Sequence, residues 1–278
     1  SLVFASMFFL IASGLSLIFG VMRILNIAHG ALYMIGAYIA YTLITEVRGL
    51  HPLVAYLMIP LTGLVVGCIG LATERFLIRY IYGREEVYQL LLTFGLALVF
   101  DDIVRIFWGL EPRSASEPYA RLGVVELGSV AYPTYNFVVM GAAAVSGLIL
   151  WYLLFKTRVG RVIRATANNR ELAQAMGVRV GKLYTLTFGL GATLVGAGGA
   201  VMLPATSATP GMGTDVIVEA FAVVAIGGLG SIKGAAVGSL IIGFLRTLGI
   251  TFFPEVELAV LYLITAGVLL VRPRGLFG

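Results

Sequence analysis

Three residues near the start of the chain, two of them polar, could contact a small polar solute inside a membrane. Asn26, His29 and Gly30 interrupt the apolar segment RILNIAHGALYMIGAYIAY, residues 23–41. If the helix breaks there, its free backbone groups must face protein or water, because lipid cannot satisfy them. Broken helices hold solutes in this way near the midplane of transporters. The alternative is that His29 hydrogen-bonds a neighbouring helix and Gly30 permits close packing.

Two adjacent carboxylates, Asp101 and Asp102, lie in the second half of another apolar segment. Ionisable residues at membrane depth suggest a functional contact, here with the amino group of a zwitterion or as a proton relay. However, Arg105 follows Asp101 by four residues, and an ion pair at that spacing neutralises both charges. Trp108 is also near, so we favour the interpretation that the group marks the membrane interface.

The second half of the chain contains a possible second break. Gly227, Gly228 and Gly230 lie together in the sequence IGGLGSIKG. Interrupted segments in both halves of a transporter point to a binding path. We therefore place these three glycines on the expected solute path, although the two segments share no residue pattern.

The rest of the chain must form the helices that position these residues. Of its 278 residues, 59% are hydrophobic and only 12% are charged, with a mean hydropathy of +0.99. Soluble domains carry roughly a quarter charged residues. We therefore predict an all-α, polytopic membrane protein with about eight or nine transmembrane segments of roughly 20 residues, some of them broken or re-entrant. Residues 1–278 are expected to form a single transmembrane domain.

Signatures of an enzyme, a metal site or a nucleic-acid binder are missing from the sequence. It contains no phosphate-binding P-loop and no dinucleotide motif, and its two histidines stand far apart. A lone Cys68 excludes an internal disulfide. The net charge of +5 comes from basic residues at the ends of apolar segments, where they orient helices and contact anionic lipid. We expect no enzymatic activity, no cofactor and no nucleic acid, so another chain must supply any ATP hydrolysis.

The longest polar stretch, residues 156–182, is strongly basic and is therefore expected in the cytoplasm. Asn168 can cap a short helix there, Glu171 would complete a capping-box-like pair, and Gly177 supplies the stop. The loop of residues 109–133 has no basic excess and is expected outside. The N-terminus faces outward if residues 23–41 form a full span, and inward if they are re-entrant.

The short helix has one apolar face, because Leu172, Ala175 and Met176 fall at positions i, i+3 and i+4. A basic loop that only obeys the positive-inside rule has no need of a capped amphipathic helix. The sequence therefore predicts a docking site for a cytoplasmic subunit.

Together these segments resemble the branched-chain amino acid permease family of ATP-binding-cassette importers, of the LivH and LivM type and more closely LivH. The resemblance covers nearly the whole chain and rests on residues 23–41, 90–109, 160–201 and 222–248 and on the terminal RPRGLFG. The stretches NIAHG and GGLGSIKGA are specific to the family only in combination.

The resemblance implies a coupling loop at residues 156–182. Glu171 and Gly177 stand at the spacing of the family motif E-A-A-x-x-x-G, with Leu172 in place of the first Ala and Ala173 as the second. The expected contacts with the ATPase are Arg170, Glu171, Leu172, Ala173, Ala175, Met176 and Gly177.

The resemblance also implies the partners. These are a second, homologous LivM-like permease, two cytoplasmic ATPase subunits that bind ATP and magnesium, and an extracytoplasmic solute-binding protein, in a bacterial-type inner membrane. Members of the family carry hydrophobic amino acids, urea, short amides or aromatic acids, so the substrate stays open. The alternatives are a ribose-type sugar permease, an ion-coupled secondary transporter, and a channel-like or purely scaffolding membrane subunit.

Overall fold

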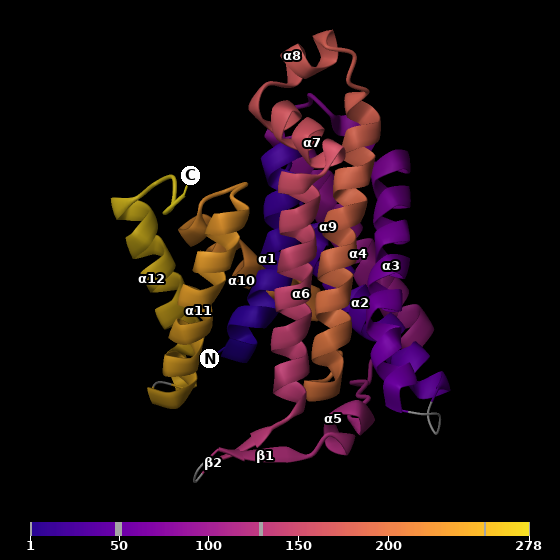
Figure 1. Ribbon diagram of the computed structural model, residues 1–278, viewed down its shortest axis with the longest axis vertical. Coiled ribbons are helices and arrows are strands. Elements are labelled where there is room, and N and C mark those ends of the chain that lie inside the picture. Colours follow the sequence, from indigo (N-terminus) through magenta and orange to yellow (C-terminus); the bar gives the residue numbers. More distant parts are fainter. Residues whose placement is uncertain (1, 48–51, 128–129, 253, 278) are drawn as a thin grey trace.

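The computed structural model describes residues 2–47, 52–127, 130–252 and 254–277. It confirms the predicted all-α class, since the only sheet in these ranges is a small hairpin. The helices run along the long axis of the molecule and form one bundle (Figure 1). The elements are α1 (Leu2–Met22), α2 (Ala28–Glu46), α3 (Pro52–Phe76), η1 (Ile78–Ile81), α4 (Glu86–Trp108), α5 (Glu117–Arg121), β1 (Val124–Leu127), β2 (Val130–Pro133), α6 (Tyr135–Lys156), α7 (Arg158–Asn168), α8 (Arg170–Ala175), α9 (Val180–Met202), η2 (Leu203–Ala205), α10 (Met212–Gly227), α11 (Ile232–Phe252), η3 (Pro254–Val256) and α12 (Glu257–Val271).

Five helices among the described residues are long and apolar enough to cross a membrane by themselves: α1, α3, α6, α9 and α11. The other helices of the bundle, α2, α4, α10 and α12, are shorter or more polar and pack beside these five. Helix α2 is largely buried against protein, whereas α4 buries one face and leaves the other exposed. The expected number of eight or nine crossings stays a prediction.

Helix α9 lies at the centre of the bundle and packs on α1, α2 and α3. Glycines allow its backbone to approach the neighbouring helices closely. A Cβ atom added at Gly199 would lie 2.2 Å from the carbonyl oxygen of Tyr33, and one added at Gly36 would lie 2.5 Å from that of Gly196. Small residues drive helix association in this way where lipid removes the hydrophobic effect. The glycine-rich sequence of α9 is therefore packed tightly against its neighbours.

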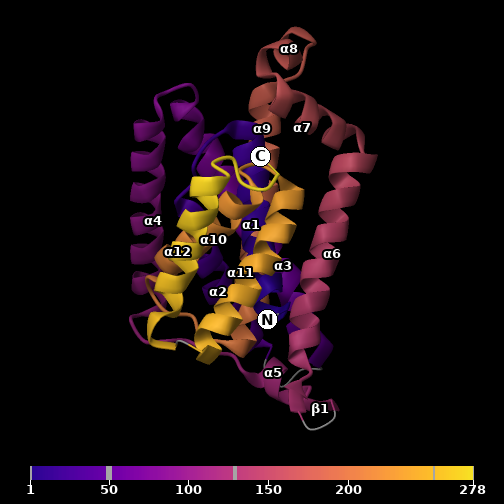
Figure 2. The ribbon, with the colours of Figure 1, turned by 90° about the vertical axis from the view of Figure 1, so that its left-hand side faces the viewer.

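The two polar regions lie at opposite ends of the bundle (Figure 1). Helices α7 and α8, which contain most of the basic stretch, cap one end, and α5 with the β1–β2 hairpin caps the other. The N-terminus lies toward the hairpin end and the C-terminus toward the α7–α8 end in both views (Figures 1 and 2). With α7 and α8 in the cytoplasm, this arrangement corresponds to an outward N-terminus.

At both predicted helix breaks the structure has a turn between two separate helices. Helix α2 runs without interruption from Ala28, so Asn26 belongs to the turn after α1, and His29 and Gly30 belong to the first helical turn. The turn forms because the backbone reverses at Arg23, whose φ is 55°. The second glycine cluster likewise joins two helices, because Gly228 and Gly230 adopt positive φ angles that end α10 before α11 begins.

Candidate transport pocket and coupling helix

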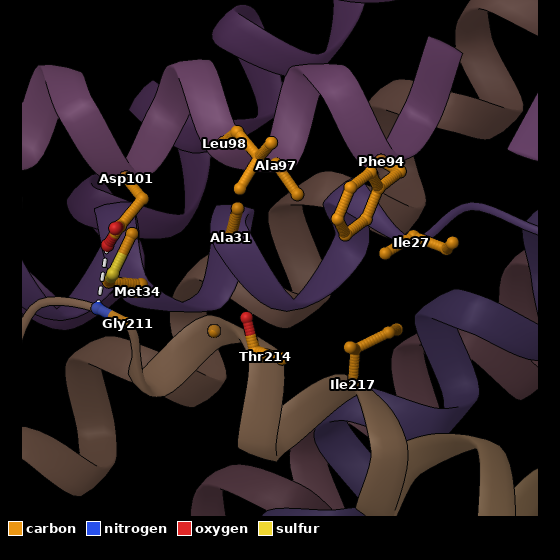
Figure 3. Close-up of a pocket in the computed structure, with 11 residues that line it drawn as sticks. Ile27, Ala31, Met34, Phe94, Ala97, Leu98, Asp101, Gly211, Thr214 and Ile217 are labelled. Atoms are coloured by element: carbon orange, nitrogen blue, oxygen red, sulfur yellow. Dashed lines mark hydrogen bonds between the residues drawn. The ribbon is translucent and has the colours of Figure 1, made fainter. Parts of the chain in front are cut away.

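A narrow pocket opens between α2, α4 and α10, and Figure 3 shows the side chains that line it. Its walls are mostly apolar, with one carboxylate and one hydroxyl. The lining residues are Ile27, Ala31, Met34, Phe94, Ala97, Leu98, Asp101, Gly211, Gly213, Thr214 and Ile217. Its volume is about 60 Å³, well below the roughly 300–1,000 Å³ of small-molecule sites. The pocket must therefore widen, or be completed by another chain, before it holds a solute.

Asp101 closes one end of this pocket and joins α4 to α10. Its Oδ1 accepts a hydrogen bond of 2.6 Å from the backbone N–H of Gly211, the N-cap residue of α10 (Figure 3). Its Oδ2 lies 2.5 Å from Nη2 of Arg105, so the ion pair expected at this spacing is present. A carboxylate at a helix N-terminus is stabilised by the free N–H groups and the helix dipole. Asp102, by contrast, is exposed.

Asn26 and His29 are fully buried in the protein, and neither lines this pocket. His29 Nε2 lies 3.1 Å from the carbonyl oxygen of Ile11, which ties the start of α2 to α1. This contact matches the alternative interpretation, in which His29 hydrogen-bonds a neighbouring helix. The amide of Asn26 has no hydrogen-bond partner within the described part of the chain. A buried amide in that state needs an explanation, such as a contact made in another conformation.

The glycines of the expected solute path have packing contacts. A Cβ atom at Gly30 would lie 2.0 Å from the carbonyl oxygen of Gly213, so this glycine lets α2 touch the start of α10. Gly227 approaches Gly234, and Gly228 approaches Gly275. In the structure these positions lie at close contacts between helices, and their place on a solute path stays a prediction.

The predicted cytoplasmic helix is present as α8, but its N-cap is Asn169. The Oδ1 of Asn169 accepts a hydrogen bond of 2.9 Å from the N–H of Leu172. Asn168 is still helical as the last residue of α7, a helix that the sequence reading missed. Because Glu171 is then only the second residue of α8, the predicted capping-box-like pair with Asn168 is wrong.

The predicted stop at Gly177 is confirmed in detail. Gly177 has φ +84°, its N–H donates to the carbonyl of Gln174, and the N–H of Val178 donates to that of Ala173. These two hydrogen bonds form a Schellman motif, which ends a helix at a left-handed residue. The end of α8 is therefore held by defined hydrogen bonds.

The predicted apolar face of α8 points outward. Leu172 is 61% exposed and Met176 is 79% exposed, and Ala175, Arg170 and Glu171 are exposed as well. Ala173 is the exception, because it is buried and fastens α8 to the protein. Large apolar side chains left in water at one end of the molecule mark an interaction surface.

Comparison with known proteins shows the family of the chain. A family model described as "Branched-chain amino acid transport system / permease component" matches residues 1–270. The chain belongs to this permease family. The permease is 29% identical to the high-affinity branched-chain amino acid transport system permease protein BraD of Pseudomonas aeruginosa, with 98% of the chain and 92% of BraD covered. It is 26% identical to LivH of Escherichia coli over the same shares, and 27% identical to a probable LivH of Methanocaldococcus jannaschii over 91% and 80%.

The permease also contains an intramembrane ion pair that the sequence reading missed. Glu219 of α10 is 5% exposed and pairs with Nη1 of Arg246 on α11. The guanidinium of Arg246 also lies 5.1 Å and 5.7 Å from the ring centres of Phe4 and Phe8 on α1. Arg246 therefore bonds inside the bundle and does not extend to the end of its helix. The available signal was one acid and one base in consecutive apolar segments, which is the usual pattern of buried charges in membranes.

Proposed function

We propose that the permease is one membrane subunit of an ATP-driven importer for hydrophobic, branched-chain amino acids in a bacterial-type cytoplasmic membrane. Two cytoplasmic ATPase subunits would bind ATP and magnesium, and an extracytoplasmic protein would deliver the solute. The family and the names of the relatives support the substrate class. The transmembrane chain itself would carry no cofactor.

The observation that carries the proposal is the outward face of α8. This helix projects beyond the bundle at the cytoplasmic end (Figures 1 and 2), and it is capped at both ends although it has only six residues. Helices this short are unstable alone, so the caps maintain a shape that is useful for contact. Leu172 and Met176 would enter a groove of the ATPase, while buried Ala173 transmits the motion into the bundle.

The apolar pocket supports a solute with an aliphatic side chain over urea or a short amide. Met34, Phe94 and Ile217 offer apolar surface and no hydrogen bonds, whereas urea needs several donors and acceptors. Thr214 and Asp101 give the pocket a polar end. In this proposal the solute passes along α2, α4 and α10. When the turn after α1 moves, the amide of Asn26 forms hydrogen bonds with the solute or with water.

The outer face of α4 supports a second permease subunit as partner. Phe94 is 49% and Leu98 is 53% exposed beside the pocket, and the Asp102 carboxylate is exposed on the same helix. An exposed carboxylate on a membrane helix is costly in lipid but acceptable against protein or water. We therefore propose that a homologous, LivM-like permease covers α4 and completes the pathway.

The docking role is tested by replacing Leu172 with Glu and measuring how much ATPase copurifies with the permease. The matched control is Leu110→Glu, since Leu110 is 71% exposed at the opposite end of the molecule. Only the Leu172 variant should lose the ATPase, because a carboxylate on the docking face must be desolvated. If both variants copurify with equal amounts of ATPase, α8 is not the docking site.

Coupling is tested separately with Gly177. Nothing lies within 4 Å of its added Cβ, so a larger residue meets only the cost of the left-handed backbone, about 1–2 kcal/mol. Gly177→Trp should stay in the membrane but uncouple ATP hydrolysis from uptake, whereas Gly177→Asn should behave almost normally because Asn tolerates this conformation. A panel of leucine, valine, urea and acetamide in the same assay identifies the solute class.

A further inference from the structure

A polar cavity lies at the cytoplasmic end of the bundle, away from the transport pocket. It consists of two adjoining pockets of about 530 and 610 Å³, a size typical of small-molecule sites. Arg23, Glu86, Gln89 and Asn168 line both of them, so the two pockets share one central wall. We refer to this space as the Arg23 cavity.

Charges of both signs surround the cavity. Arg23 and Glu86 lie on the shared wall, and Arg84, Arg170 and Glu171 line one side. Gln89 and Asn168 add amide groups, which donate and accept hydrogen bonds. A site with separate cationic and anionic side chains fits a ligand that carries an anionic group and an ammonium group together.

Two features show that the cavity is more than a gap between helices. Thr166 is one of the residues that line it, and this residue is only 2% exposed, with a hydroxyl that has no hydrogen-bond partner among the described residues. A buried hydroxyl without a partner costs free energy, which marks this wall of the cavity as unusual. Arg23 has φ 55°, and it is the only non-glycine residue with positive φ in the described ranges. Backbone strain of this kind is concentrated at functional sites.

The position of Arg23 strengthens this argument. Its N–H donates to the carbonyl of Phe19, so it directly follows the last turn of α1, where glycine is the usual residue. An arginine in this left-handed conformation costs free energy relative to glycine, but it places a guanidinium in the cavity. If the residue were needed only to end the helix or to orient it in the membrane, glycine or a neighbouring arginine would serve.

We propose that the Arg23 cavity binds a small zwitterionic group from the cytoplasmic side, with its anion on Arg23 and its ammonium on Glu86. Two sources share this chemistry: a free amino acid and the ethanolamine headgroup of a phospholipid. Arg170 and Glu171 belong both to the cavity wall and to α8, so a bound ligand contacts the helix proposed to dock the ATPase. Occupancy would therefore change ATPase activity from the cytoplasmic side. This last step rests on the proposed function, whereas the binding itself does not.

The experiment uses the importer assembled with its ATPase subunits in nanodiscs, without the solute-binding protein. Radiolabelled leucine is titrated in discs of phosphatidylcholine and phosphatidylglycerol, and bound phosphatidylethanolamine is counted by native mass spectrometry in discs that contain it. Arg23→Gln and Glu86→Gln should each weaken the binding of one of these probes by about tenfold or more, the effect expected for a lost charge-assisted hydrogen bond. Arg75→Gln is the control, since Arg75 is an exposed arginine outside the cavity.

A glycine variant separates binding from folding. Arg23→Gly relieves the backbone strain, so its thermal midpoint should equal or exceed that of the wild type while binding is lost. Leucine binding that is lost in Arg23→Gly and Glu86→Gln identifies a free amino acid as the ligand of the cavity, and loss of phosphatidylethanolamine retention alone in these variants identifies the lipid headgroup. Wild-type binding of both probes by Arg23→Gly and Glu86→Gln, or no binding of either probe by the wild type, would overturn the proposal. Uptake is not measured, so failure here is distinct from failure of the import function.

Discussion

The carboxylate of Asp101 caps α10 by accepting a hydrogen bond from the N–H of Gly211 at 2.6 Å. This contact fastens the start of α10 to α4 beside the transport pocket, and it brings a charge from one half of the chain to a helix end in the other. Movement of α10 relative to α4 must break it, so its strength limits how readily the pocket opens.

Asp101→Leu should free the first turn of α10. Loss of the cap and of the dipole interaction costs about 1–2 kcal/mol at a partly buried helix end. Hydrogen exchange of residues 212–215 should therefore become faster. The control Asp102→Asn should leave the exchange rates of these amides unchanged, because Asp102 is exposed. If Asp101→Leu protects these amides as well as the wild type does, α10 is held by other contacts.

Gly30→Ala should destabilise the permease. The added methyl group would lie 2.0 Å from the Gly213 carbonyl oxygen and 2.8 Å from Cβ of Ile217, and overpacking of this kind costs about 1–3 kcal/mol. Gly141→Ala is the matched helical control, because nothing lies within 4 Å of its Cβ and alanine favours a helix by about 0.5–1 kcal/mol. Thermal midpoints in detergent should move in opposite directions, and a neutral Gly30→Ala would show that α2 and α10 are loosely packed.

The Glu219–Arg246 pair predicts a strongly non-additive mutant cycle. Either Glu219→Leu or Arg246→Met leaves one buried charge unpaired, which costs about 3 kcal/mol or more. The double variant removes both charges and should lose much less. Denaturation of the two single variants and the double variant measures the coupling. Additive losses would mean that each charge is satisfied by other groups or by water.

Tyr82, in the connection between η1 and α4, predicts a pH dependence at the cytoplasmic end. Burial, and then its hydrogen bond to the buried Glu74 carboxylate, raise the pKa of the Tyr82 hydroxyl above its usual value near 10. A raised pKa in the folded state means that its contribution to stability is complete below pH of about 10 and is lost as the pH rises further.

Tyr82→Phe should therefore cost about 1–3 kcal/mol at neutral pH, because Glu74 loses its donor. The difference in stability between wild type and this variant should shrink above pH of about 10. The control is Tyr80→Phe, since Tyr80 is 76% exposed and should show no such difference at any pH. If the difference in stability between wild type and Tyr82→Phe stays constant as the pH rises above about 10, the Tyr82 hydroxyl is not responsible for the pH dependence.

The sequence allowed the features that depend on local chemistry to be predicted. Apolar segments predicted the helices, and Gly177 predicted the stop of α8 through its left-handed conformation. The excess of arginine predicts which end is cytoplasmic. The N-cap was misplaced by one residue, because Asn168 and Asn169 have the same capping chemistry and only the length of α7 decides between them.

The features that were missed depend on contacts between distant segments. Glu219 and Arg246 look like unrelated charges until α10 and α11 pack together. The glycines at 227–230 resemble a broken helix in sequence, since a break and a turn both need positive φ angles. Asp101 was correctly paired with Arg105, but its bond to Gly211 spans 110 positions and no periodicity reveals it.

The glycine contacts around α9 have a mechanical consequence. Where Gly199 meets the Tyr33 backbone and Gly36 meets Gly196, no flexible side chains lie between the helices to absorb sliding. Helices α1, α2, α3 and α9 therefore form a stiff frame against which other parts move. Helices α4 and α10, and α10 and α11, are linked by the Asp101–Gly211 and Glu219–Arg246 contacts in addition to their packing, so any relative movement of these pairs must break a polar bond.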